Sequence, residues 1–162
     1  MAPAKRYVRG SIFDNLILEN FVGSASAPLL KTKCLTEVGA FDVLMQSSQD
    51  YDAWLRIAQR YEVDFVEEPL LLYYTYDGDR ISNNNTKKIN GTKRLIEKNK
   101  DYLNKHKKAW CSKYIALCNC YSKSGQQKEA WRLWRQGVKK CPENINSNIK
   151  AILKILFRMA RD

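Results

Sequence analysis

Apolar side chains recur at helical spacing along most of the chain, and the run is often interrupted by Gly, Asn or Pro. This pattern predicts helices at Ser11–Asn20, Thr32–Val38, Gln49–Tyr61, Lys87 to about Lys108, and roughly 109–123, 127–140 and 145–159. The helix from Gln49 has the clearest start, because Ser48 or Asp50 suits an N-terminus and acidic residues occupy the first turn. Thr32 is expected to cap the helix that Gly39 ends.

Two segments are predicted as strands. Glu62–Val66 alternates apolar and polar residues with period two, and the β-rich run Leu70–Tyr76 follows Pro69. A turn is expected at Asp77–Asp79, and Ser26–Lys31 is expected to be extended. The sequence therefore predicts an α+β, mostly helical fold with a few short strands, in which all residues after 85 are helical.

The region after residue 108 has the pattern of a helical hairpin. Gly125 predicts the turn, and Pro142 ends the second helix. Large residues in the first helix need a small residue, Ala130, opposite them so that the helices can approach. The spacing resembles the signature positions of one tetratricopeptide repeat, here Tyr114, Leu117, Tyr121, Gly125, Ala130, Trp134, Gly137 and Pro142. One repeat cannot form an extended groove, and the helix at 145–159 would cap the hairpin.

Charge divides the chain into two dissimilar parts. The net charge is +11, yet residues 1–85 carry eight Lys/Arg against twelve Asp/Glu, whereas residues 86–162 carry twenty against five. The basic part favours an anionic partner such as nucleic acid, an acidic membrane surface or an anionic lipid-linked substrate. We expect no nucleic-acid partner, because no such binding motif is present and the aromatic residues follow the packing period. Residues 151–161 are amphipathic and basic, which suits either an interfacial helix or a capping helix.

The expected location is cytoplasmic, with peripheral contact at the inner face of the membrane as a further expectation. No run approaches the roughly 18–20 apolar residues of a membrane-spanning helix, and the first residues lack the apolar core of a signal peptide. The five cysteines form no Cys-x-x-Cys pair and the chain has one histidine. We therefore expect free buried thiols and no zinc site.

The most specific pattern lies at residues 36–56, where Thr-Glu-Val-Gly-Ala-Phe-Asp is followed, after a short spacer, by Gln-Asp-Tyr-Asp-Ala-Trp-Leu-Arg. These two blocks resemble a pair found in the family 2 glycosyltransferases of the GT-A fold. The flanking segments agree as well, at Gly10–Leu16, Asn20, Val63–Tyr73 and Arg80–Ser82. The resemblance covers about residues 8–100, and it implies the acceptor-side part of an inverting transferase that uses a nucleotide-sugar donor.

The resemblance implies that Asp50 is the catalytic base, since it matches the family's aspartate that takes the proton from the acceptor hydroxyl. Such a carboxylate should lie at the end of an element and be exposed in a cleft. A helix N-terminus favours the ionised form that a base requires. Gln49, Tyr51 and Asp52 would lie near the acceptor sugar. Without the resemblance, Asp50 would be interpreted as a helix cap with no chemistry.

Nearby residues are expected to support this loop and helix. Arg56 is predicted to be a structural ion-pair partner of Asp42 or Asp52. Asp42 itself either shapes the acceptor loop or forms a turn. Trp54 falls on the apolar face of its helix, so we predict that it packs in the core and does not stack on a sugar.

A metal site cannot be assigned to these residues. The family's donor-binding half, with its Asp-x-Asp motif, precedes the matched region. Where many members place a histidine ligand, this sequence has Tyr74, Tyr76, Asp77 and Asp79. A Mg²⁺ or Mn²⁺ ion that neutralises the departing diphosphate is implied for the full-length family, but no ligand for it is identified in this chain.

Three parts are expected: an acceptor-side GT-A fragment at 1–85, a long basic connecting helix at 86–108, and a hairpin with a capping amphipathic helix at 109–162. The expected function is glycosyl transfer in bacterial-type polysaccharide or glycoconjugate synthesis. The donor would be a nucleotide sugar and the acceptor a sugar or lipid-linked saccharide, with no activity in this chain alone. The alternative is a non-catalytic protein-interaction module built on the hairpin.

Overall fold

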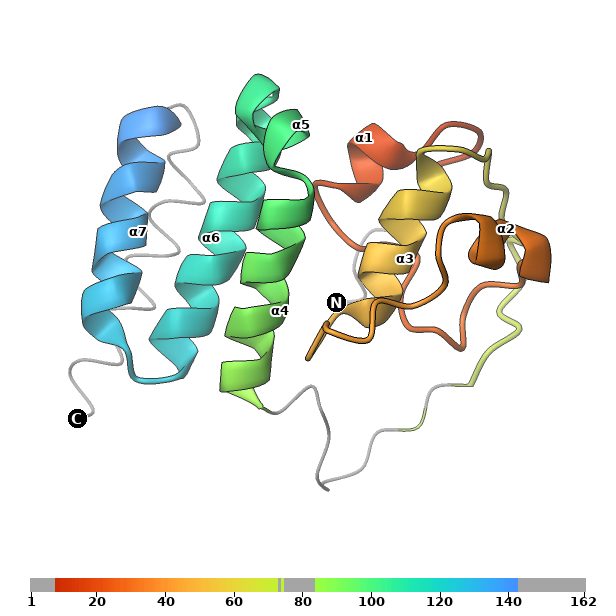
Figure 1. Cartoon of the computed structure of the whole chain (residues 1–162), viewed down its shortest axis with the longest axis horizontal. Coiled ribbons are helices and arrows are strands. Elements are labelled where there is room, and N and C mark those ends of the chain that lie inside the picture. Colours follow the sequence, from red (N-terminus) through yellow and green to blue (C-terminus); the bar gives the residue numbers. More distant parts are fainter. Residues whose placement is uncertain (1–7, 73, 75–83, 143–162) are drawn as a thin grey trace. The chain divides into compact units, whose positions relative to one another are not determined.

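The computed structural model describes residues 8–72, 74 and 84–142, and these are mostly helical. The helices in Figure 1 are α1 Phe13–Leu16, α2 Thr32–Glu37, α3 Gln49–Ala58, α4 Asn85–Lys98, α5 Lys100–Lys105, α6 Lys107–Lys123 and α7 Gln127–Lys140. The chain divides into two compact units. The first comprises Met1–Leu44 and Gln49–Asp79, and the second comprises Met45–Ser48 and Arg80–Asp162.

In the first unit, α3 is the central helix, and both α1 and α2 pack against it. Most of its residues are buried, and Leu16 and Ile17 at the end of α1 have no exposed surface. The indole nitrogen of Trp54 donates to the Gly23 carbonyl at 3.2 Å. Trp54 is 5% exposed, so the prediction that it packs in the core is confirmed.

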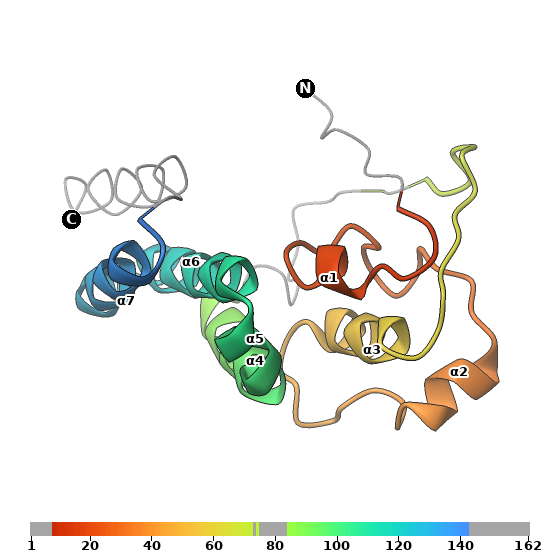
Figure 2. The same cartoon turned by 90° about the horizontal axis from the view of Figure 1, so that it is seen from above.

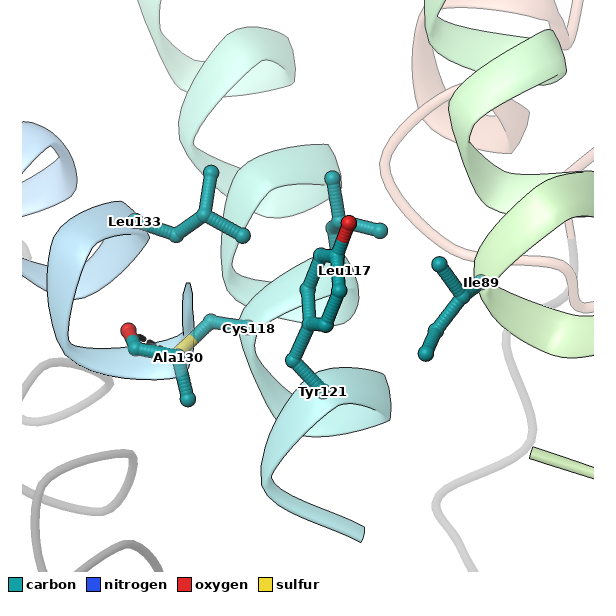
Figure 3. Packing of buried hydrophobic residues seen from close by; sticks show 6 residues of the cluster. All are labelled: Ile89, Leu117, Cys118, Tyr121, Ala130 and Leu133. Carbon is teal, nitrogen blue, oxygen red and sulfur yellow. Dashed lines mark hydrogen bonds between the residues drawn. The ribbon is translucent and has the colours of Figure 1, made fainter. Parts of the chain in front are cut away.

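In the second unit, α4, α6 and α7 lie side by side, with α6 in contact with both of the others (Figures 1 and 2). Figure 3 shows the cluster between them, formed by Ile89 of α4, Leu117, Cys118 and Tyr121 of α6, and Ala130 and Leu133 of α7. Ala130 is completely buried, so its small side chain lets α7 approach α6, as the hairpin pattern predicts. The turn residue Gly125 has φ 78°, a conformation that favours glycine.

The single helix predicted from Lys87 to Lys108 is wrong. It is interrupted at Asn99, which has φ −109° and ψ 18°, and again at His106, the residue between α5 and α6. The Asn99 side-chain nitrogen donates to the Leu95 carbonyl at 2.8 Å. A side-chain amide that bonds to a helix carbonyl offers the chain an alternative to the next helical turn, which accounts for the first interruption.

The predicted strands do not form within the described residues. A GT-A domain is not evident in this part of the chain either. Val63 makes a single bridge with Gly10, through N–H···O bonds of 2.8 and 2.9 Å. Residues 70–72 and 74 are exposed and have no regular structure. A strand needs a neighbouring strand for its backbone groups, and the Gly10–Val63 pair is the one β-bridge among the described residues. The predicted turn at 77–79, the segment 80–82 and the helix at 145–159 lie outside the described residues.

Smaller differences concern the helix ends. α1 and α3 are shorter than predicted, and Lys31, not Thr32, is the N-cap of α2. Gly39 follows that helix with φ 83°, as expected for its end. Within the described part of the chain, no helix is both long and apolar enough to cross a bilayer.

Two of the cysteines are not free, contrary to expectation. Cys111 of α6 and Cys141 after α7 form a disulfide, with their Cα atoms 6.3 Å apart. Cys34, Cys118 and Cys120 are free thiols. The disulfide joins the N-terminal part of α6 to the residue that follows α7, so it closes the hairpin covalently.

The short segment Met45–Ser48 packs on α4 within the second unit. The Asn90 side chain donates to Gln46 Oε1 at 2.8 Å. A Cβ atom added to Gly91 would lie 3.0 Å from the Ser47 carbonyl carbon and closer still to its oxygen. Gly91 is therefore required because the backbone of this segment lies directly against the helix.

Candidate functional site

The N-terminal turn of α3 presents the sequence-predicted base. Ser48 precedes the helix with φ 64°, and Gln49 and Asp50 follow as its first residues. Both are half-buried. The Asp50 carboxylate accepts a hydrogen bond from the Tyr51 backbone N–H at 2.7 Å. An ionised carboxylate offers about four acceptor positions, so this bond orients the group and leaves capacity for a ligand.

Tyr51 points into the first unit. Its side chain is 8% exposed, and its hydroxyl donates to the Leu16 carbonyl at 2.7 Å. Burial, followed by the negative charge of Glu19, raises the pKa of this hydroxyl well above its usual value. A hydroxyl held in this way fastens α3 to α1 and is not available to a sugar.

Asp52 is also buried, at 1% exposure, and it pairs with Arg56 one turn later. The guanidinium contacts Asp52 Oδ2 twice, from Nε at 2.9 Å and from Nη2 at 2.8 Å. Its remaining donors bond to the Val38 and Ala40 carbonyls, the latter at 2.7 Å. Arg56 therefore fixes the chain that leaves α2, and of its two predicted partners, Asp42 and Asp52, it pairs with Asp52.

Asp42 forms a turn. Its Oδ1 accepts from the Leu44 backbone N–H at 3.0 Å, the side-chain-to-backbone geometry of an Asx turn. The neighbouring Phe41 ring meets Trp54 edge-on, with centroids 6.3 Å apart. The loop between α2 and α3 is thus shaped by Asp42 and held by Arg56.

The structure brings the predicted residues together at the start of α3 but gives them different surroundings. Gln49 and Asp50 remain accessible, whereas Tyr51 and Asp52 are enclosed and hold the helix in place. Two supporting residues were missed by the sequence reasoning. Arg60 donates to the Glu37 carbonyl at 2.9 Å, and the Tyr61 hydroxyl bonds to the Glu37 carboxylate. The i, i+4 spacing of Arg56 and Arg60 was the available signal.

The metal ion that the resemblance implies does not fit the residues described. Among them, no three His, Cys, Asp or Glu side chains are grouped so that they could hold an ion. Residues 75–83, where the family's histidine would lie, are outside this set.

A second feature lies on α7. A cavity of about 460 Å³ is bordered there by Lys128, Trp131, Arg132, Arg135, Gln136 and Lys139. The net charge of residues 86–162 predicts a basic region but does not locate the charge on a particular surface. The intervals of three and four residues between these cations were the signal that could have identified it.

Comparison of the chain with protein-family models, with curated proteins and with solved structures finds no match.

Proposed function

We propose that the first unit carries the acceptor-side part of an inverting glycosyltransferase that uses a nucleotide-sugar donor, with Asp50 as the base. The observation that carries the proposal is the half-buried Asp50 carboxylate in the first turn of α3, which the Tyr51 backbone N–H orients. The acceptor hydroxyl would attack the anomeric carbon while its proton passes to Asp50. The bond from that carbon to the diphosphate would break, with inversion of configuration.

The surroundings of Asp50 support this role because they fix its position. The Tyr51 hydroxyl ties α3 to α1, and the Asp52–Arg56 pair ties it to the chain after α2. A rigid support is what a positioned base requires. In this proposal Gln49 is the second acceptor contact, and Tyr51 and Asp52 are positioning residues.

The acceptor in this proposal is a sugar or a lipid-linked saccharide, used in polysaccharide or glycoconjugate synthesis. The half-buried Gln49 and Asp50 offer an amide and a carboxylate, which suit hydrogen bonding to sugar hydroxyls. The chain alone is expected to release no UDP from UDP-sugars when acceptors are present, and measurable release would contradict that expectation.

Acceptor binding can be tested by titrating the protein with a panel of mono- and disaccharides while recording its amide NMR spectrum. We expect shifts centred on Gln49 and Asp50. Asp50→Asn should weaken binding roughly 10- to 100-fold, because a hydrogen bond to a charged group contributes about 1.5–3 kcal/mol. Asp14→Asn is the matched control, since Asp14 is also a first-turn carboxylate in this unit, on α1. Equal effects of the two variants, or shifts confined to other residues, would refute the assignment.

A further inference from the structure

Four cationic side chains form a stripe along one side of α7. They are Lys128, Arg132, Arg135 and Lys139, and all four are exposed. Their intervals of four, three and four residues keep them on one side of a helix. The buried residues Ala130, Leu133 and Gly137 occupy the opposite side, towards α6. At 1.5 Å per residue the stripe is about 16 Å long. We call it the α7 stripe.

The charge of the α7 stripe is largely uncompensated. Arg132 pairs with Glu129 at 2.8 Å, but no acidic side chain pairs with the other three cations within the part of the chain that the structure describes. Like charges three and four residues apart destabilise a helix. The stripe is therefore unfavourable for α7 by itself, and an anionic surface placed against it would relieve the repulsion.

An aromatic residue borders the stripe. Trp131 is half-buried, lines the cavity beside the cations, and meets Trp134 edge-on with centroids 5.3 Å apart. Tryptophan at the boundary between an apolar core and a charged surface is typical of contact with the headgroup region of a membrane. The apolar side of α7 is occupied by α6, so this contact would stay at the level of the headgroups.

We propose that the α7 stripe binds the surface of an anionic phospholipid bilayer. The stripe is straight and one-sided, which suits a flat surface of negative charge. The surrounding unit adds to the attraction, because residues 84–142 carry sixteen Lys/Arg against three Asp/Glu. The proposal does not depend on the glycosyltransferase assignment, since none of its residues belongs to the first unit.

The test is co-sedimentation of the full chain with vesicles of phosphatidylcholine, with and without 30 mol% phosphatidylserine, at about 0.1 M salt. The stripe variant replaces Lys128, Arg132, Arg135 and Lys139 with Gln. The control variant replaces the exposed lysines Lys87, Lys105, Lys108 and Lys123 with Gln, so both variants lose the same charge. Thermal unfolding followed by circular dichroism checks that each is folded.

We expect the wild type to bind the anionic vesicles only, and to release them as salt is raised. A basic residue near an anionic surface strengthens binding roughly fivefold, so loss of the three cations that pair with no described acidic side chain should weaken binding on the order of 100-fold. The affinity of the control variant for the anionic vesicles should fall less than tenfold. Equal losses in the two variants, or no binding by the wild type, would overturn the proposal. So would a stripe-dependent binding of single-stranded oligonucleotide without any binding of vesicles.

Discussion

Arg56→Met tests whether the buried ion pair holds the start of α3. Methionine replaces the aliphatic part of the arginine side chain but lacks the guanidinium. Asp52, which is 1% exposed, then loses its cationic partner. Removing one partner of a buried pair costs about 3–5 kcal/mol, because a buried charge is left uncompensated. The Arg56 side chain is 22% exposed, so water can reach the vacated position. We therefore expect the lower end of that range, about 3 kcal/mol.

Native-state hydrogen exchange of the α3 amides is the suitable assay, because it reports the stability of this unit separately from the second one. A loss of 3 kcal/mol should speed exchange about 100-fold, since every 1.4 kcal/mol is a factor of ten. Arg60→Met is the matched control. Arg60 lies just beyond the same helix and also donates to a carbonyl, that of Glu37, but it is exposed. Its loss should speed exchange less than fivefold.

The result that would refute this reasoning is an Arg56→Met variant whose α3 amides exchange within threefold of the wild type, or no faster than those of Arg60→Met. Either outcome would mean that Asp52 is stabilised sufficiently by its other neighbours. A double variant with Asp52→Asn measures the coupling directly, and the two losses should be far from additive.

Three further predictions concern buried groups. Above pH 10 the unfolded Tyr51 loses its proton while the folded one retains it, so the first unit should lose stability as pH rises, and Tyr51→Phe should remove this part of the pH dependence in α3 hydrogen exchange. Gly91→Ala should destabilise the second unit by about 1–3 kcal/mol in urea unfolding, because overpacking against Ser47 outweighs the helical preference of alanine. Burial raises the pKa of Cys118 to about 11, so iodoacetamide at pH 8 should alkylate it far more slowly than Cys34 in a mass-spectrometric time course.

The helical hairpin was predictable because its signals are local. Gly125 at a left-handed turn and Ala130 opposite large side chains determine α6 and α7 through contacts between neighbours in sequence. The strand predicted at 62–66 does not form, because a strand depends on a distant partner and, among the described residues, this segment makes one bridge, from Val63 to Gly10. The disulfide was missed for the same reason, since Cys111 and Cys141 are 30 residues apart and meet only once the hairpin forms.

The candidate site was predictable in part. The sequence predicted an ion pair of Arg56 with Asp42 or Asp52, and the structure shows the one with Asp52, four residues earlier on the same helix. The burial of Tyr51 was not foreseen, because its position beside Asp50 in the motif favoured a role at the acceptor. Its hydroxyl instead bonds to Leu16, 35 residues earlier, and such long-range contacts leave no periodic signal in the sequence.

The placement of Met45–Ser48 has a consequence for dividing the protein into fragments. The polypeptide crosses from one unit to the other three times, after residues 44, 48 and 79, so no single cut separates them. A fragment that starts at α4 would lack the backbone that lies against Gly91 and would leave that side of the helix open to solvent. The second unit can be completed only after a loop of more than 40 residues closes between Ser47 and Gly91, and such closure slows folding.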